Sequence, residues 1–472
     1  MGVHLLIDFG STFTKVLAVD MDREIVLGRA QAPSTADEDI TIGLRAALDA
    51  LFGGNRSLEP AAIERRLACS SAAGGLRMVA VGLVPELTVE AARRAALGAG
   101  AKLIRSYAYE LDDEAIAEIE ARPSDVILLA GGTDGGNKDV ILSNAGRLAA
   151  CGTRASFIVA GNKVVAAKVT DILRSAGKHA ERTENVLPEL GTLNVEPARA
   201  AIREVFIKRV VHAKGLDKAE AYVGDILMPT PMATLKAARL LADGNGEEPG
   251  LGELMVVEIG GATTNIHTIA DGYPSQPDVL FKGLPEPYAK RTVEGDLGLR
   301  HNAVTILEVA GADRLSEALG SIADGKGAGV DFRQYASALS RNPGFVPESD
   351  EHFSMDAALA RAACEVAVGR HAGSLEETPS WAGGAVRIQR GKDLSALGTV
   401  IGTGGIFCHG RHADKVLAAA LFSRRDPFSL RPRKANFYVD AGYIMYGVGL
   451  LSDVLPAKAL RLAKKCLRRI EI

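Results

Sequence analysis

Two stretches of sequence decide the fold: VHLLIDFGSTFTKVLAVD at residues 3–20 and LMVVEIGGATTNIHTIAD at residues 254–271. In each, an apolar strand ends at an acid, Asp8 or Glu258, and is followed by a glycine turn and an alternating, β-branched strand. Residues 8–15 align without gaps to residues 258–265, 250 positions apart. A repeat of this period is too long for a solenoid and predicts two duplicated lobes.

The acid and glycine turn of each hairpin are suited to holding a nucleotide phosphate. Glycine lets the backbone approach an oxyanion, successive N–H groups form an anion-binding concavity, and hydroxyls add donors. The residues expected to contact phosphate are Gly10, Ser11, Thr12, Gly260, Gly261 and Thr263. Asp8 and Glu258 would hold Mg²⁺ through its waters, since that ion gives up its hydration shell reluctantly. Two such hairpins facing one another would clamp the β- and γ-phosphates.

The rest of the chain predicts an α/β protein with two lobes. Residues 125–148 and 156–176 read as buried strands that alternate with helices, as in a sheet covered on both faces. DGNGEEPGLG at 243–252 reads as a linker, which predicts an N-terminal lobe over 1–245 with an inserted α/β segment and a C-terminal lobe over 253–472.

Several shorter segments have their own predictions. Residues 40–53, 60–68 and about 196–214 read as helices, and 69–83 as a strand pair around a Gly74-Gly75 turn. The closing segment, PAKALRLAKKCLRRIEI, reads as a basic amphipathic helix that could dock an acidic partner, although a solvated helix face is the commoner explanation.

Composition excludes several classes of protein. The 472 residues are 47% hydrophobic and 24% charged, with net charge −3, so no overall field favours nucleic acid or anionic membrane. No apolar run is long enough to span a bilayer, and no leader is evident. The five cysteines are scattered without metal-ligand spacing, which is typical of a reducing compartment. We therefore expect a cytoplasmic protein without a nucleic-acid or membrane partner.

Other phosphate-binding folds fit poorly, because the sequence contains no G-x-x-x-x-G-K-[ST] and its other glycine turns lack the G-x-G-x-x-G spacing. Asp134, in the turn GGTDGGN after a buried strand, is a candidate catalytic or magnesium-linked carboxylate; an Asx turn or helix cap is an equally good reading. Lys15 either approaches the phosphate or, as is commoner on an alternating strand, faces solvent.

Some charged and polar residues have only weak functional readings. Glu294 and Asp296 could be linked to an ion and Arg300 could reach a phosphate, but surface ion pairs explain them equally well. The histidines have no mutual metal spacing, and Asn162 and Lys163 are singled out only by their position in a turn.

Together these blocks resemble the superfamily of actin, heat-shock chaperones and sugar kinases. Residues 8–12 are similar to its first phosphate motif and 258–263 to its second. IGTGG at 401–405 is similar to its adenosine motif, which assigns Gly402, Gly404 and Gly405 to the nucleotide. Residues 441–449 are similar to its second connecting helix. The resemblance implies an actin-like ATPase fold, with two duplicated ribonuclease H-like lobes and a nucleotide cleft between them.

Within that superfamily the chain resembles the MutL/GlmL family, the accessory proteins of adenosylcobalamin-dependent glutamate mutase. That family is unrelated to the mismatch-repair protein called MutL. The segments that carry the likeness run nearly end to end: CSSAAGGLRMVAVGLVPELTVEAARRAALGAGA at 69–101, LLAGGTDGGNKD at 128–139, EIGGATTNIHT at 258–268 and RTVEGDLGLRHNA at 291–303.

The resemblance implies an ATP-dependent reactivating or assembly chaperone for a cobalamin-dependent mutase, using Mg-ATP and contacting the mutase subunits; a homo-oligomer is possible. Two positions depart from the superfamily: Glu258 stands where Asp is usual, and Asn265 where a second acid is frequent. Because neutral Asn cannot take a proton, we expect binding with slow hydrolysis. The alternatives are a small-molecule kinase with Asp134 as base, and a scaffold that binds nucleotide without hydrolysing it.

Overall fold

The chain folds into two compact units in a computed structural model that describes residues 2–35, 38–54, 58–71, 76–99, 101–210, 219, 222–224, 226–323, 331–379 and 385–472. Unit 1 comprises Met1–Ala72, Lys218–Lys282 and Glu286–Ile472. Unit 2 comprises Ala73–Asp217 with Gly283–Pro285. The division into lobes at residues 245 and 253 stays a prediction.

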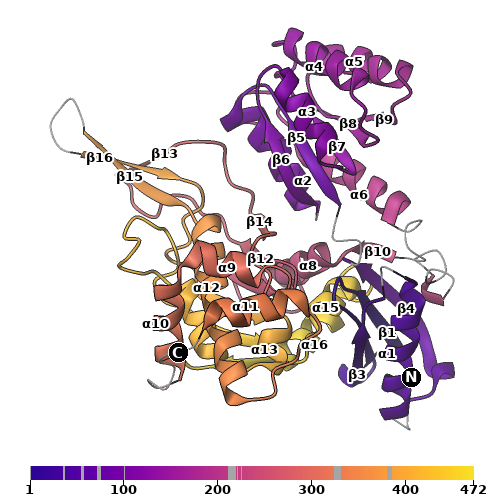
Figure 1. The fold of residues 1–472 in the computed structure, drawn as a ribbon, viewed down its shortest axis with the longest axis vertical. Helices are drawn as coiled ribbons and strands as arrows, with labels where there is room; N and C mark the ends of the chain where they lie inside the picture. The colour runs from indigo at the N-terminus through magenta and orange to yellow at the C-terminus, as the bar shows by residue number, and fades with distance from the viewer. Residues whose placement is uncertain are drawn as a thin grey trace. The chain divides into compact units, whose positions relative to one another are not determined.

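The first hairpin lies at the centre of a five-stranded sheet in unit 1 (Figure 1). Its strand order is β10-β4-β1-β2-β3, with β2 and β3 antiparallel to their neighbours and β4 and β10 parallel to β1. The strands are β1 (Val3–Phe9), β2 (Phe13–Asp20), β3 (Ile25–Pro33), β4 (Ile63–Ser70) and β10 (Ile226–Pro229). Helix α1 (Ile40–Gly54) packs on β2 and β3.

The second hairpin, formed by β11 and β12, belongs to a six-stranded sheet in unit 1. The strand order of this sheet is β14-β12-β11-β17-β18-β19. The strands are β11 (Leu254–Ile259), β12 (Thr264–Ile269), β14 (Ala289–Glu294), β17 (Thr399–Thr403), β18 (Asn436–Asp440) and β19 (Leu467–Ile470). Its first five strands repeat the chain order and directions of the first sheet, with an antiparallel triplet followed by two parallel strands. This duplication of a ribonuclease H-like sheet is the actin-like ATPase fold.

The two sheets share one apolar core. It contains Leu6 and Leu17 from the first hairpin and Leu254 and Val256 from the second, all buried against α8, α15 and α16. These helices span Thr230–Asp243, Met445–Leu451 and Pro456–Cys466. Helices α8 and α15 approach so closely that a Cβ at Gly449 would lie 1.9 Å from the Ala233 carbonyl oxygen.

A second core in unit 1 covers the other face of the six-stranded sheet. Its central helix, α12 (Asp350–His371), is buried along much of its length among smaller helices. These are α9 (Ala303–Ala310), α10 (Ala312–Ile322), α11 (Phe332–Arg341), α13 (Gly405–His409) and α14 (Ala413–Leu417), with a 3₁₀ turn at Ala418–Ala420. A small sheet of β13 (Val279–Phe281), β16 (Ala385–Arg390) and β15 (Ser374–Pro379) projects from the helices as an arm (Figure 1).

Unit 2 is a parallel sheet with strand order β6-β5-β7-β8-β9. The strands are β5 (Arg77–Val81), β6 (Lys102–Tyr107), β7 (Val126–Leu129), β8 (Ser156–Val159) and β9 (Ala180–Arg182). The helices are α2 (Glu90–Gly98), α3 (Asp113–Ala121), α4 (Asp139–Ala150), α5 (Lys163–Ser175) and α6 (Glu196–Val210). The predicted alternation of buried strands and helices over 125–176 is confirmed.

Three predictions of local structure are wrong. Residues 60–68 form a 3₁₀ turn, Pro60–Ala62, followed by β4, because pairing with β1 and β10 buries its apolar half. Strands β4 and β5 belong to different sheets and do not form a pair; the Gly74-Gly75 turn lies outside the described residues. The closing helix α16 ends at Cys466, after which Leu467–Ile470 pairs with β18 as strand β19.

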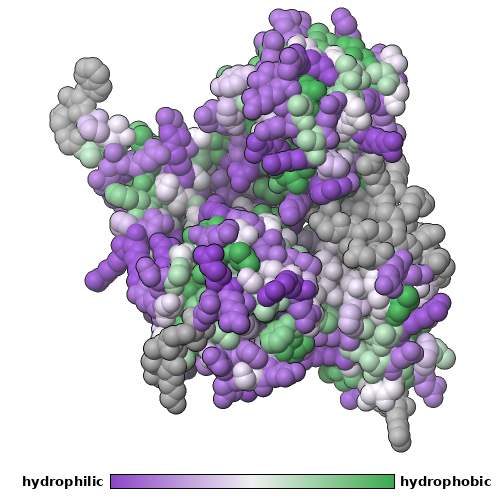
Figure 2. Space-filling model, viewed as in Figure 1, coloured by the Kyte–Doolittle hydropathy of each residue, from purple (hydrophilic) through white to green (hydrophobic). Residues whose placement is uncertain are grey.

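The face of the molecule in Figure 2 is mainly hydrophilic, with small scattered groups of hydrophobic residues. Among the helices of the described ranges, none combines the length and the apolar character that crossing a membrane requires.

Candidate functional site

The two hairpins have the same register and the same turn geometry. Asp8 lies opposite Lys15 in the first, and Glu258 lies opposite Asn265 in the second. The turns close with matching bonds, from Gly10 N to the Phe13 oxygen at 3.1 Å and from Gly260 N to the Thr263 oxygen at 2.9 Å. The repeat read from the sequence is thus a structural repeat, which places each acid at the same point beside its turn.

The tips of the two hairpins meet within unit 1. A Cβ at Gly261 would lie 2.9 Å from the Thr12 hydroxyl oxygen, so the two turns are in close approach. That hydroxyl is buried and has no hydrogen-bond partner among the described residues. A buried, unpaired hydroxyl between two glycine turns is a donor that a phosphate oxygen would satisfy. The residues at the tips therefore fit the predicted anion.

Asp8 is fully buried and held by two charged or polar partners. Lys15 Nζ lies 2.8 Å from its Oδ2, and the Thr230 hydroxyl donates to its Oδ1 at 2.6 Å. The Lys15 ammonium also lies 4.6 Å from the centre of the Tyr443 ring. Burial lowers the pKa of Lys15, but Asp8 and Tyr443 outweigh it, and the net shift is upward. Lys15 is therefore a paired cation beside the hairpin, and the solvent-facing reading is wrong.

Glu258 is the centre of a buried polar network. Its Oε2 accepts bonds from Asn265 Nδ2 at 3.1 Å and from His267 Nε2 at 3.0 Å, and its Oε1 accepts one from the Thr234 hydroxyl at 3.2 Å. Burial raises the pKa of Glu258, but the hydrogen bond from His267, the charge of Arg291 and the hydrogen bond from Asn265 bring it below its usual range. The carboxylate is therefore ionised and its oxygens are largely committed to protein donors.

His267 and Arg291 support this carboxylate from the neighbouring strands. His267 is fully buried, and burial lowers its pKa despite the nearby carboxylate, so the ring is neutral and donates through Nε2. Burial also lowers the pKa of Arg291, to about 10, and its guanidinium donates to Asn265 Oδ1 at 3.4 Å. His267 has no metal-ligand spacing to the other histidines, and only its position two residues after Asn265, on the same strand face, signals the contact with Glu258.

Helix α8 links the two acids, which the sequence analysis did not foresee. Thr230 and Thr234 lie one helical turn apart, and their hydroxyls bond Asp8 and Glu258 respectively. The only signal in the sequence is the four-residue spacing of two threonines in TPMATLKAARLLAD. One turn of helix thus ties both hairpins to a common support.

The turn assigned to adenosine also reaches the second hairpin. Gly404 has φ +111°, and a Cβ there would lie 2.2 Å from the Ile259 carbonyl oxygen. Next to it, Thr403 donates to Asp440 Oδ2 at 2.9 Å, and burial raises the pKa of Asp440. The three motifs at 8–12, 258–263 and 401–405 are therefore packed together in unit 1, as the resemblance implied.

Asp134 belongs to unit 2, whereas the hairpins belong to unit 1. Its Oδ1 accepts bonds from the Lys163 backbone N–H at 2.9 Å and from Asn185 Nδ2 at 3.0 Å, and its Oδ2 pairs with Lys163 Nζ at 3.3 Å. Burial raises the pKa of Asp134 but these bonds outweigh it, so the net shift is downward. Asp134 thus joins loops and the start of α5, which favours its structural reading; its catalytic role stays a prediction.

The remaining charged candidates form ion pairs. Glu294 and Asp296 both bind Arg370, at 2.7 and 2.9 Å, and Arg300 binds the buried Asp356 at 2.6 Å. In the closing segment, Lys464 pairs with Glu248 and Lys465 with Glu24, so these lysines form contacts within unit 1 itself.

In the part of the chain that the structure describes, no three His, Cys, Asp or Glu side chains gather as metal ligands. Asp8 and Glu258 would therefore hold Mg²⁺ through its bound waters.

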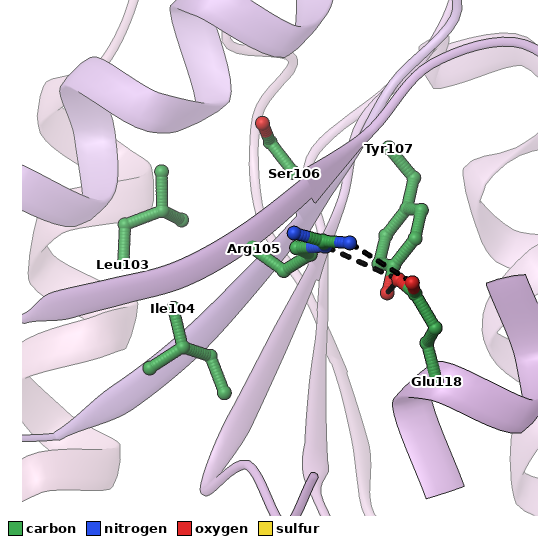
Figure 3. A pocket seen from close by; sticks show the side chains of 6 residues that line it. All are labelled: Leu103, Ile104, Arg105, Ser106, Tyr107 and Glu118. Carbon is green, nitrogen blue, oxygen red and sulfur yellow. Dashed lines mark hydrogen bonds and ion pairs between the residues drawn. The ribbon is translucent and has the colours of Figure 1, made fainter. Parts of the chain in front are cut away.

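A surface hollow in unit 2 is lined by Leu103–Tyr107 of β6 and by Glu118 (Figure 3). Arg105 and the Tyr107 hydroxyl both donate to the Glu118 carboxylate. Burial and the bond to this carboxylate raise the pKa of Tyr107 to about 12. Figure 3 shows Arg105 bonded to Glu118, and Tyr107 donates to the same carboxylate, so the charged groups of this hollow are already paired.

Comparison with known proteins identifies the family. The family model described as MutL protein matches residues 4–467. Protein MutL of Clostridium tetanomorphum is 46% identical over 474 residues, covering 100% of both chains. Similar solved structures include a nucleotide-free acetone carboxylase (13% identity, 96% of this chain and 70% of that chain, TM-score 0.41) and a xylulose kinase from Bifidobacterium adolescentis (12%, 98% and 93%, TM-score 0.30). Scores this low do not establish a shared fold, which follows here from strand order. By family model and full-length identity, the chain belongs to the MutL protein family.

Proposed function

We propose that this protein binds Mg-ATP between its two hairpins and serves as an accessory, reactivating chaperone of an adenosylcobalamin-dependent mutase such as glutamate mutase. The observation that carries the nucleotide part is the meeting of two glycine turns at the buried, unpaired Thr12 hydroxyl, with an acid beside each turn. The mutase part rests on membership of the MutL family.

Each residue of the site would have its own role in binding Mg-ATP. Backbone N–H groups of both turns and the Thr12 hydroxyl would bind phosphate oxygens, while Lys15 supplies positive charge next to them. Asp8 and Glu258 would orient the waters of Mg²⁺, and Gly402, Gly404 and Gly405 would lie against the nucleoside. Bound Mg-ATP would supply the phosphoanhydride and the metal charge.

The same contacts support slow hydrolysis. A general base must be free to accept a proton from water, yet Glu258 accepts three bonds from protein donors and Asn265 is engaged with Glu258 and Arg291. We therefore propose that nucleotide binding, and the closure it stabilises, matters more than fast turnover. Closure would alter the surface that the protein offers to the mutase. Nucleotide and mutase would be coupled because each binds the open and the closed state with a different affinity.

Calorimetric titration of the full chain with Mg-ATP and Mg-ADP tests the nucleotide part. Thr12→Val keeps the shape of the side chain and removes the unpaired hydroxyl, so we expect ATP affinity to fall by about tenfold with the nucleotide-free Tm unchanged or higher. Thr41→Val, in α1, is the matched control. Absence of binding at millimolar nucleotide, or equal binding by both variants and wild type, would contradict the proposal.

Co-purification tests the partner. We expect the tagged chain to retain mutase subunits, with the amount retained depending on Mg-ATP, and to restore activity to mutase that carries damaged cofactor. ATP turnover that rises sharply with one small acceptor and is indifferent to the mutase would instead identify a kinase. The cytoplasm, where such a mutase works, is the proposed location.

A further inference from the structure

An arginine-rich cavity lies in unit 1 outside the nucleotide site. It has a volume of about 500 Å³ and is formed by α10, α12 and the segment 418–431. Its lining carries five arginines against two glutamates, an excess of positive charge, and includes no residue of either hairpin. The arginines are Arg314, Arg361, Arg424, Arg425 and Arg431. Cavities of this size hold small-molecule ligands in many proteins.

Three of the arginines are engaged at the wall of the cavity. Arg425 pairs with Glu317, and Arg314 lies 4.0 Å from Glu365. The guanidinium of Arg361 donates to the backbone carbonyl oxygen of Lys415 in α14. Two of these three contacts are with carboxylates, whereas the contact of Arg361 is with a neutral carbonyl oxygen and does not offset its positive charge.

Arg431 is the buried member of the set, with only 6% of its surface exposed. Its Nε donates to the Ser429 hydroxyl at 3.2 Å, and its Nη2 lies 3.6 Å from the partly exposed Asp426 carboxylate. A Cβ at Gly369 would lie 2.5 Å from Nη2, so the guanidinium packs directly against α12 where that helix has no side chain. The position of this guanidinium is therefore constrained on several sides.

The Nη1 atom of Arg431 is buried and has no hydrogen-bond partner among the described residues. A buried guanidinium N–H without an acceptor is costly, and Arg431 is itself one of the residues that line the cavity, so an anion held there is a candidate acceptor. Arg424 adds an exposed guanidinium on the same cavity, and no carboxylate of the described ranges forms an ion pair with it. The two side chains together could bind one anion.

We propose that this cavity binds a small, multiply charged oxyanion, bearing phosphate or carboxylate groups, through the guanidinium groups of its lining arginines, Arg431 and Arg424 among them. Guanidinium groups suit both kinds of oxyanion because their planar donors match two oxygens at once. The ligand contacts α10 and α12, and α12 also carries Asp356, the partner of Arg300 beside the second hairpin. The cavity is thus an effector-type site in the same unit as the nucleotide site.

Calorimetric titration of the full chain with inorganic pyrophosphate and, separately, with citrate tests the proposal. We expect at least one probe to bind at millimolar concentration or below, and Arg431→Gln to weaken that binding by about tenfold or more. Preference for pyrophosphate would identify a phosphate ligand, and preference for citrate a polycarboxylate. Arg387→Gln, which removes an ion-paired arginine of β16 outside the cavity, is the matched control.

Two further variants keep the outcome interpretable. Arg424→Gln changes an exposed side chain without breaking an ion pair between described residues, so it tests the cavity even where Arg431→Gln does not fold; we expect a several-fold loss of affinity. Thr12→Val distinguishes the two places where pyrophosphate could bind. This variant should weaken pyrophosphate binding at the hairpins and leave pyrophosphate binding at the cavity unchanged. Equal binding by wild type and both arginine variants, or no binding of either probe, would overturn the proposal.

Discussion

The ion pair between Lys15 and Asp8 leads to the sharpest prediction about stability. Lys15→Met keeps the length and the apolar stem of the side chain but leaves an ionised Asp8, 1% exposed, with the Thr230 hydroxyl as its remaining strong partner. Removing one member of a buried ion pair costs about 3–5 kcal/mol. Because the Lys15 side chain is 20% exposed, we expect the lower end, about 3 kcal/mol.

Urea unfolding followed by circular dichroism measures this loss, and the transition of unit 1 should shift while that of unit 2 does not. Asp8→Asn in the Lys15→Met background removes the stranded charge, so the double variant should regain about 1–2 kcal/mol over Lys15→Met. Lys236→Met is the matched control, since Lys236 pairs with the half-exposed Asp453 and should cost less than about 1 kcal/mol. A Lys15→Met protein as stable as the control, or a double variant with no recovery, would refute the reasoning.

Three other changes have predicted outcomes. Thr234→Val should cost about 1.5–3 kcal/mol of unfolding free energy, measured with urea, because the ionised Glu258 loses a buried bond. Burial lowers the pKa of His267 below 6.5, so the unfolded chain takes up its proton before the folded chain does; stability should therefore decrease as pH falls through about 6.5, and by less in His267→Gln. Gly449→Ala should lower Tm and cost about 2–3 kcal/mol of stability, because the new methyl group would overlap a backbone oxygen of α8. Gly320→Ala, on α10 where the new methyl group meets open space, should not lower Tm.

Local sequence was sufficient to predict the hairpins and the strand–helix alternation of unit 2. A strand that ends in an acid and a glycine turn is specified by neighbouring residues, and the tight turn then sets the register that places Lys15 opposite Asp8 and Asn265 opposite Glu258. Residues 60–68 show the limit of this reasoning. Their helical pattern was overridden by pairing with β1 and β10, which a chain read locally does not reveal.

Side-chain partners were harder to predict than elements. Lys15 had two readings, near the phosphate or in solvent, because an alternating strand exposes every second residue; in the structure it pairs with Asp8 and lies over the ring of Tyr443, far along the chain. Asp134 was read either as a catalytic or magnesium-linked carboxylate or as an Asx turn or helix cap, and its partners Lys163 and Asn185 within unit 2 favour the structural reading. In both cases the deciding contact comes from a segment that composition and spacing do not connect to the residue.

The sequence by itself determined the duplicated hairpins, their acids and glycines, and the family, because these depend on short runs of residues and on a repeat that is visible without coordinates. Only the tertiary structure decided how the acids are held: Thr230 reaches Asp8 across 222 positions of chain, and Thr234 and His267 take up the oxygens of Glu258. A buried carboxylate must be satisfied by whatever donors the fold brings to it, and those donors are chosen by packing between helix α8 and the two sheets rather than by proximity in sequence.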